Sequence, residues 1–203
     1  ADAGTAVVSG GKDGSFDSRA RHTLDGEGRR ILTEYLDESG GVLRRLRAVF
    51  ENELLRREVW EDGSGDPVRG PDGYATVDHA YHENGHRIER VYGGYAGPAA
   101  AARRARYDEA GRLESETWFD SAGKPAAGPE GWAERRIGYD PASGMTLTES
   151  HFDAAGEPVA LEGGHHTIRY GYDPRTGAVV EKRLEGYAGT PHATRTNGPT
   201  SGT

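Results

Sequence analysis

The chain has 203 residues, no cysteine and a net charge of −8. Its acidic balance argues against a nucleic-acid partner, because neutralising phosphates takes clustered Lys and Arg. The lack of cysteine excludes disulfides, thiolate zinc sites and a cysteine nucleophile, and no apolar run approaches the roughly 20 residues of a membrane span.

The core that this composition allows is thin. Leu, Ile, Val and Phe together supply roughly 15% of the residues, a level low enough to warn of disorder. However, the ten Tyr and three Trp recur at regular positions along the chain. We therefore expect a folded repeat array, in which each unit buries its apolar face against its neighbours.

The two ends differ in composition from the middle. Residues 1–15 are mostly Gly, Ala, Ser and Asp and predict a flexible lead-in, while residues 193–203 are rich in Thr, Gly, Ser and Pro and predict a disordered tail. We expect a hairpin repeat array over 16–192. Its first part, 16–46, has irregular turns at Asp25 and Asp37 and is interpreted as a degenerate capping unit.

The segment from Leu43 to Trp60 supports two interpretations. It is rich in helix formers, and Leu43, Leu46, Phe50 and Leu54 fall at helix-like spacing. The repeat register instead predicts one strand that ends at Phe50 and a second strand from Leu54 to Trp60.

A short motif recurs about every 26 to 33 residues, within the range of repeat architectures. An aromatic residue, usually followed by Asp, leads into a turn that ends at Gly, and an alternating run follows. Asp can bond the backbone two residues on, and Gly takes the left-handed position. The copies are Phe50–Asn52, Tyr81–Gly85, Tyr107–Gly111, Tyr139–Gly144 and Tyr172–Gly177. They predict an all-β fold of about five tandem antiparallel β-hairpins in an elongated sheet with flexible termini.

The pattern from Tyr107 to Thr117 resembles the tyrosine–aspartate (YD, or RHS-type) repeats of bacterial surface and toxin-delivery proteins. The Phe-Asp-x-x-Gly-x-Pro turns at Phe119–Pro125 and Phe152–Pro158 are similar to a variant of that repeat, and the resemblance covers about residues 47–191. It implies successive hairpins joined into a coiling antiparallel sheet, and a secreted or cell-surface location. Long arrays of that family form shells or stalks, but about five units are too few to close a shell.

Large aromatic residues cluster near the ends of the longer connections between hairpins. They pack between units in one interpretation, and in the other they form flat platforms for sugar rings or anchors for a protein. Trp118 is expected to face outward if Phe119 faces the core. The platform residues are Trp60, Trp118, Trp132, Tyr74, Tyr95 and Tyr187.

Three histidines, His79, His82 and His86, form an H-x2-H-x3-H cluster that could bind zinc or copper. In the repeat register His82 takes the Asp position of a turn, and strand alternation points His79 and His82 to opposite faces. The other interpretation is therefore that these are surface and turn histidines.

The leading functional hypothesis is a non-enzymatic recognition or scaffold repeat module of a secreted bacterial surface protein, without a cofactor, that binds a polysaccharide or a protein partner. The alternatives are a structural segment of an RHS-like toxin-delivery protein and a metal-dependent hydrolase that uses the His cluster. An exposed edge strand at either end of the array also predicts end-to-end self-association.

Overall fold

The computed structural model describes residues 5–9, 19–95, 100–186 and 191–194, and these form fourteen strands and no helix. The all-β fold of successive antiparallel hairpins is therefore confirmed. The chain divides into two compact units, Ala1–Ala96 and Gly97–Thr203. None of the described residues belongs to a helix that could cross a lipid bilayer.

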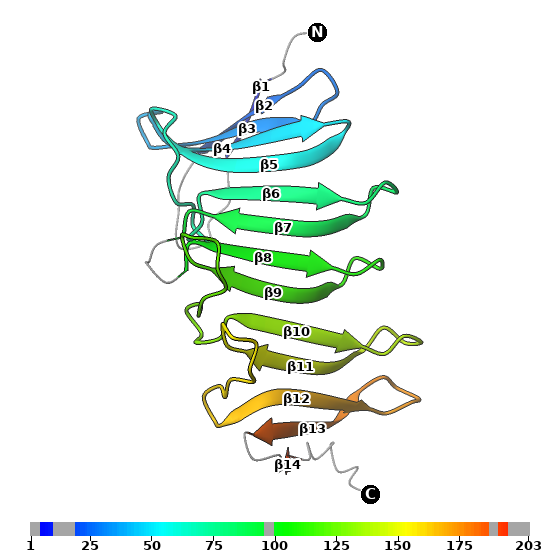
Figure 1. Cartoon of the computed structure of the whole chain (residues 1–203). Coiled ribbons are helices and arrows are strands. Elements are labelled where there is room, and N and C mark those ends of the chain that lie inside the picture. The colour runs from blue at the N-terminus through cyan, green and yellow to red at the C-terminus, as the bar shows by residue number, and fades with distance from the viewer. Residues whose placement is uncertain (1–4, 10–18, 96–99, 187–190, 195–203) are drawn as a thin grey trace, which may run out of the picture. The chain divides into compact units, whose positions relative to one another are not determined.

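In each unit the strands follow one another in sequence order, and the neighbours within a unit are antiparallel (Figure 1). The first unit contains β1 (Thr5–Ser9), β2 (Arg19–Leu24), β3 (Arg30–Leu36), β4 (Val42–Glu51), β5 (Leu54–Asp62), β6 (Thr76–Tyr81) and β7 (Arg87–Gly93). The second contains β8 (Ala102–Tyr107), β9 (Leu113–Phe119), β10 (Glu134–Tyr139), β11 (Thr146–Phe152), β12 (His165–Tyr172), β13 (Val179–Gly186) and β14 (Pro191–Thr194).

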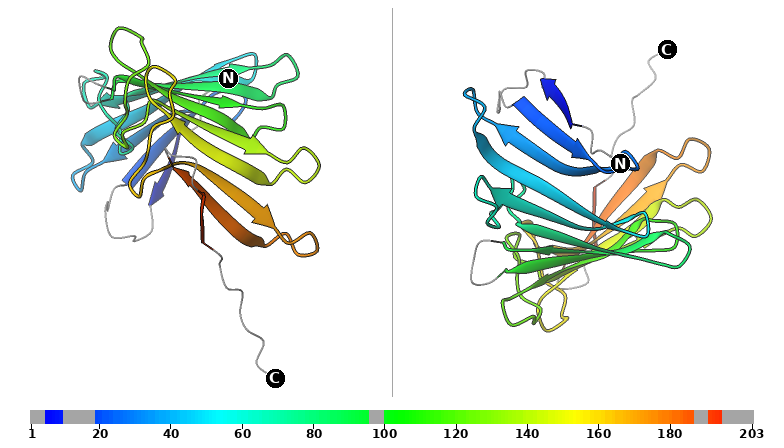
Figure 2. Two further views of the ribbon diagram at one scale, coloured as in Figure 1. Left: turned by 60° about the horizontal axis from the view of Figure 1, so that its bottom comes forward. Right: turned by 90° about the horizontal axis from the view of Figure 1, so that it is seen from above.

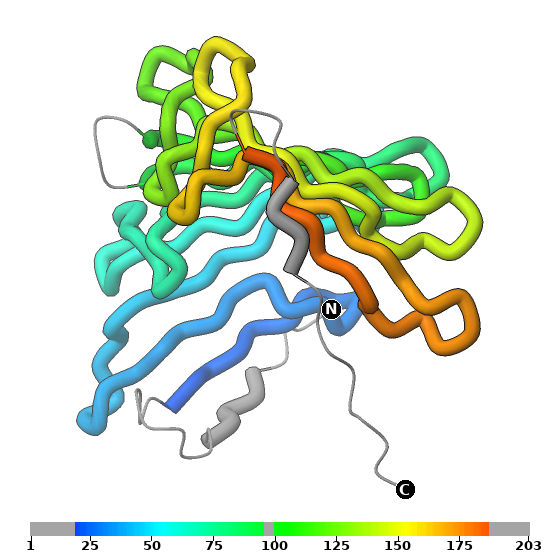
Figure 3. Tube along the Cα trace, turned by 90° about the horizontal axis from the view of Figure 1, so that it is seen from below, coloured from blue at the N-terminus to red at the C-terminus, as the bar shows by residue number. Residues whose placement is uncertain are grey.

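Within the second unit, the tight hairpin turns and the long connections occupy opposite ends of the strands, as both views of Figure 2 show. The long connections run over residues 120–133 and 153–164. The β12–β13 hairpin is rotated relative to the β10–β11 hairpin (Figure 3), as the right-handed twist of strands requires.

The Asp of the repeated motif holds the tight turn together. The carboxylate of Asp108 accepts bonds from the backbone N–H groups of Ala110 (3.0 Å) and Arg112 (2.9 Å). The same pattern recurs at Asp25, Asp120 and Asp153. These bonds favour the ionised carboxylate and, with the Arg112 side chain, lower the pKa of Asp108 against the opposing effect of burial. The predicted turn chemistry is confirmed.

Each turn follows a β-bulge directly before the motif's first residue. The register shifts between Ala80 and Tyr81 in β6, and between Gly138 and Tyr139 in β10. It also shifts between Thr23 and Leu24 in β2. The strands from Arg19 to Leu46 are joined by two tight turns, at Asp25 and Asp37, and the role of this part as a capping unit stays a prediction.

The segment from Leu43 to Trp60 forms strands, so the helical alternative is wrong. β4 and β5 pair from Arg44 to Glu51 and meet at a two-residue turn, where Asn52 and Glu53 both have positive φ, 49° and 65°. Two successive residues with positive φ make a type I′ turn, whose twist matches that of the flanking strands. Pairing partners on both strands outweigh the intrinsic helix propensity of the Leu and Arg residues.

Another correction concerns the N-terminal lead-in. Thr5–Ser9, which lie in the segment predicted to be flexible, form β1 and pair with Arg19–Thr23 of β2. Thr and Val favour strands, and they outweigh the Gly and Asp that surround them. At the other end the last strand, β14, runs to Thr194, and residues 195–203 lie outside the described part of the chain.

Neighbouring hairpins share few backbone pairs. The strands β9 and β10 pair over only three residues each, as do β11 and β12. A tyrosine adds a further connection in both cases. The hydroxyl of Tyr139 donates to the carbonyl of Leu113 at 2.8 Å, and that of Tyr172 donates to the carbonyl of Thr146 at 2.7 Å. The Tyr of the repeated motif therefore ties its own hairpin to the preceding one.

The core lies beneath the long connections. Trp60 and Trp118 each occupy the end of a return strand and are only 8% and 7% exposed. A Cβ built on Gly70 would lie 2.3 Å from the Trp60 indole nitrogen, and one on Gly128 would lie 2.3 Å from that of Trp118. The connection therefore rests its backbone directly on the indole, and only glycine fits there.

The third long connection has different residues at both of these positions. His151 occupies the position of Trp118, since Val159 donates to the His151 carbonyl as Ala126 donates to that of Trp118. Ten residues on, Leu161 occupies the position of Gly128, since both accept from the N–H three residues later. A smaller ring at the first position is thus accompanied by a larger side chain at the second, which is the change that close packing between the two positions would require.

We expect Asp153→Ala to lower the Tm by roughly 2–4 °C, because two backbone N–H groups lose their acceptor. Asp153→Asn should restore most of the loss, since its amide oxygen can accept the same bonds. Thermal unfolding followed by circular dichroism measures both. A matched control is Glu157→Ala, an exposed side chain in the same turn; equal losses in Asp153→Ala and this control would contradict the assigned role of Asp153.

We expect Gly128→Leu to lower the free energy of unfolding by about 2–3 kcal/mol, because its side chain overlaps the Trp118 indole. Combining it with Trp118→His recreates the His151–Leu161 pair. The double variant should be at least 1 kcal/mol more stable than the sum of the two single losses predicts. Urea unfolding of the four proteins measures this coupling, and strict additivity would show that the ring and the connection do not pack as described.

Candidate binding pocket and the predicted site residues

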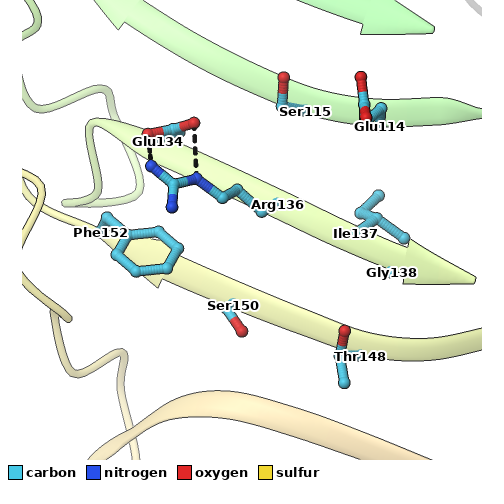
Figure 4. Close-up of a pocket in the computed structure, with 9 residues that line it drawn as sticks. All are labelled: Glu114, Ser115, Glu134, Arg136, Ile137, Gly138, Thr148, Ser150 and Phe152. Carbon is cyan, nitrogen blue, oxygen red and sulfur yellow. Dashed lines mark hydrogen bonds and ion pairs between the residues drawn. The ribbon is translucent and has the colours of Figure 1, made fainter. Parts of the chain in front are cut away.

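A shallow pocket of about 420 Å³ opens between β9, β10 and β11 in the second unit (Figure 4). We call it the Gly138 pocket. It is lined by Glu114, Ser115, Glu134, Arg136, Ile137, Gly138, Thr148, Ser150 and Phe152.

The pocket exists because the ladder between β9 and β10 stops early. The last paired residues are Ser115 and Arg136, and the next residues along each strand, Glu114 and Ile137, line the opening. Gly138 lies opposite Thr148 of β11, and a Cβ on Gly138 would approach the Thr148 hydroxyl to 2.5 Å. The Thr148 side chain thus takes up the space that a side chain on Gly138 would need.

In other hairpins, the residue at the position of Gly138 or its partner on the return strand is larger. Ala80 pairs with Glu89, and Arg106 pairs with Ser115. Gly171 again lacks a side chain, but it pairs with Glu181, whose Cβ lies 3.1 Å from the position that a Cβ on Gly171 would take. The combination of Gly with a short hydroxyl side chain therefore distinguishes the β10–β11 hairpin from these three.

The charged groups of the pocket neutralise one another. Arg136 donates two hydrogen bonds to Glu134, at 2.8 Å and 2.7 Å, and the hydrogen bond to Glu134 raises the pKa of Arg136. Its guanidinium also lies 4.2 Å from the ring centroid of Phe152. The pair is thereby held in one orientation at the pocket's edge (Figure 4). The pocket offers hydroxyl groups, one fixed ion pair and the exposed carboxylate of Glu114.

The predicted tryptophan platform is not exposed. Trp118 is 7% exposed, so the expectation that it faces outward is wrong, and Trp60 and Trp132 are buried too. Trp132 packs between Trp118 and His151, with ring centroids 6.4 Å and 5.7 Å apart. The long connections cover this face, and strand alternation alone could not show which face they would cover.

The tyrosines of the predicted platform lie partly exposed. Tyr74 and Tyr95 are half-buried, with ring centroids 6.1 Å apart, and Tyr74 also contacts Tyr92 at 5.1 Å. Burial, with a smaller contribution from the nearby Asp72 carboxylate, raises the pKa of Tyr74 to about 12. Tyr187 lies outside the described residues.

The three histidines of the predicted metal cluster are not brought together. His79 is buried, and its Nε2 lies 3.0 Å from the Glu58 carboxylate on the neighbouring strand. His82 and His86 are exposed and close the β6–β7 turn through a backbone bond of 2.8 Å. Among the described residues, no group of three or more His, Asp or Glu side chains is placed to hold a metal ion.

The face that carries the tryptophans also carries a row of paired charges. Glu116 is 9% exposed, and it accepts from Arg103 at 3.2 Å and from Arg135 at 2.9 Å. Arg135 also reaches Glu149 at 3.3 Å. These residues come from β8, β9, β10 and β11, so the row connects strands of different hairpins. Its charges are engaged with one another, which suits a structural role.

The Gly138 pocket was missed by the sequence analysis. A signal was present, because a glycine inside a strand pattern often marks a bulge or a close approach of a ligand or another backbone. Gly138 directly precedes Tyr139, so it is easily absorbed into the turn motif. The short side chains of Ser115, Thr148 and Ser150 alternate with bulkier residues and do not form a contiguous motif.

Burial makes the stability of the second unit sensitive to pH through His151. This side chain is 4% exposed, and burial, followed by the smaller effect of Arg135, lowers the pKa of His151 despite the nearby Glu149. A group with a lowered folded-state pKa contributes stability above its unfolded pKa, near 6.5 for histidine, and that stability is lost as the pH falls through the folded value.

We therefore expect the free energy of unfolding to fall between about pH 7 and pH 5, and to fall less steeply in His151→Gln. Urea unfolding at several pH values measures the two slopes. Part of the slope should remain in the variant because burial also lowers the pKa of His22. Identical slopes in the wild type and His151→Gln would contradict the role assigned to His151.

No family model matches the chain, and no curated protein matches it. Among solved structures, it is similar to a chain of the TcdB2–TccC3–Cdc42 complex, with a TM-score of 0.45 and 14% identity over 83% of this chain and 9% of that chain. It is also similar to a chain of TcdB2–TccC3, with a TM-score of 0.40 and 13% identity over 87% of this chain and 11% of that chain. The chain thus spans only a small part of the length of either.

Proposed function

We propose that the chain is a non-enzymatic repeat module of a secreted or cell-surface protein, and that it recognises a polysaccharide or a protein through one polar sheet face. This polar face comprises Ser115 and Thr117 of β9, Thr148 and Ser150 of β11, and Arg136 of β10. The observation that carries the proposal is the Gly138 pocket, which lies within this face.

Several titratable side chains are bonded to partners within the fold, and this supports recognition over catalysis. Glu116 is held by two arginines, His79 by Glu58, and the turn carboxylates such as Asp108 by backbone N–H groups. Each of these groups stabilises the fold. The polar face offers donors and acceptors for binding, whereas acid–base chemistry needs a group that can exchange a proton with a bound substrate.

The repeat architecture supports a scaffold role for the same module. Bulges, Asp-bonded turns and tyrosine contacts such as Tyr139 to Leu113 recur from one hairpin to the next. Such a module could also be a structural segment of an RHS-like toxin-delivery protein, as the Tyr-Asp motifs suggest. In that setting the polar face would contact another part of the assembly.

We expect Ser115→Glu to abolish binding to a partner without unfolding the chain. The new side chain would lie between Arg106 and Arg136, its partners on the two neighbouring strands, where opposite charges are favourable. It would also cover the pocket. Binding of the purified chain to bacterial cell-wall polysaccharides, glycans and surface-protein fragments, each immobilised, measures the effect.

The matched control is Val59→Glu, which adds a carboxylate beside Arg47 in the first unit and should leave binding unchanged. A partner that binds the wild type and Ser115→Glu equally would place recognition elsewhere on the chain. Failure of every polysaccharide, glycan and protein to bind would count against a recognition module and favour a purely structural segment.

A further inference from the structure

The size of the Gly138 pocket suits a single ring. Its volume of about 420 Å³ lies in the lower part of the range for small-molecule sites, roughly 300–1,000 Å³. The pocket is bounded by three adjacent strands rather than by a long groove, so it has room for one ring-sized group rather than an extended chain segment.

The hydroxyl groups of the lining both donate and accept hydrogen bonds. Ser115 and Thr148 come from strands on either side of Gly138, and Figure 4 shows their side chains around the opening. The Ser150 hydroxyl is held by Thr167 at 2.9 Å. A ligand whose own groups also donate and accept would match this lining, and sugar hydroxyls have that property.

The balance of charge favours a neutral ligand. Glu134 and Arg136 form a paired, mutually satisfied couple, and Glu114 adds one exposed carboxylate to the lining. An anionic ligand would be repelled by Glu114. A cation would gain only an exposed carboxylate, whose attraction is weak in water.

The apolar part of the lining is small and lies to the sides. Phe152 and Ile137 supply it, and the guanidinium of Arg136 covers one face of the Phe152 ring. A pyranose has a similar division, with C–H groups on its faces and hydroxyls around its edge, whereas a fully apolar ring would leave the hydroxyls of Ser115 and Thr148 without partners.

We infer that the Gly138 pocket binds one neutral pyranose residue through hydrogen bonds to the Ser115 and Thr148 hydroxyls. The inference rests on the recognition function proposed above and assigns to it a ligand class. The ring would lie in the opening between β9 and β10, beside the Ser115 and Thr148 hydroxyls.

The test is a titration of the ¹⁵N-labelled chain with methyl pyranosides, followed by amide chemical shifts. The neutral probes are the methyl glycosides of glucose, galactose, mannose and N-acetylglucosamine, and the charged probes are methyl glucuronide and methyl glucosaminide. We expect at least one neutral probe to shift the amides of Ser115, Gly138 and Thr148. Thr148→Val should weaken its apparent Kd about tenfold, as expected for one lost hydrogen bond.

Thr76→Val is the matched control, because it removes the same kind of hydroxyl opposite a glycine, Gly93, in the first unit, and it should leave the Kd unchanged. Ser115→Ala is a second variant that repeats the test without altering β11. The inference fails if no neutral probe shifts these amides, if a charged probe binds more tightly, or if Thr148→Val and Ser115→Ala both keep the wild-type Kd.

The two proposals can fail separately. In one outcome, a polymer or protein binds the wild type but not Ser115→Glu, and no pyranoside shifts the pocket amides. That result would preserve the recognition function and overturn the pyranose assignment. Absence of binding in both experiments would overturn both.

Discussion

The fold depends on one contact, in which the long connection after a hairpin rests on a tryptophan near the end of the return strand, as at Trp60 and Trp118. Adjacent hairpins such as β8–β9 and β10–β11 share only three backbone pairs between them, and these are too few to hold the two hairpins together alone. The contact adds buried apolar surface at that junction. At Gly70 and Gly128 the connection contacts the tryptophan ring with its backbone, so a larger residue in place of either glycine would need a smaller ring beneath it. At the matching positions of the third connection, His151 replaces the tryptophan and Leu161 replaces the glycine.

The core is thin, and this explains the polar interactions between the strands. Among the described residues, no large side chain is completely buried, so polar interactions have to contribute between strands. The row formed by Arg103, Glu116, Arg135 and Glu149 crosses four strands on the face of the tryptophans, and the hydroxyls of Tyr139 and Tyr172 bond backbone carbonyls of preceding hairpins. This explains why a chain with few aliphatic residues is rich in Tyr, Arg and Glu. The charges on this face serve the fold.

The Gly138 pocket differs from the rest of the sheet, where the side chains contact one another and stabilise the fold. In three other hairpins at least one of the two residues paired at the position of Gly138 is large, as in the pairs Ala80 with Glu89, Arg106 with Ser115 and Gly171 with Glu181. In the β10–β11 hairpin both strands carry small residues, and the ladder to β9 ends just before them. A repeat array tolerates such a change because each hairpin depends only on its neighbours. A binding site can therefore arise in one unit without disturbing the pattern of the others.

The amino-acid sequence by itself determined the hairpins, their turns and the order of the strands. Those features depend on residues close together in the chain: Asp108 with the next four residues, or the alternation along β9. For the helix-like segment around Phe50 the repeat register predicted strands, but the helix stayed open until the pairing of β4 with β5 was known. The tertiary structure alone decided which sheet face is buried, and therefore that Trp118 is core. It also decided that His79 faces Glu58 rather than His82 and His86, and that Gly138 lies at an opening. Alternation divides residues between two faces but does not say which face the connections will cover, because that depends on packing between residues from different strands.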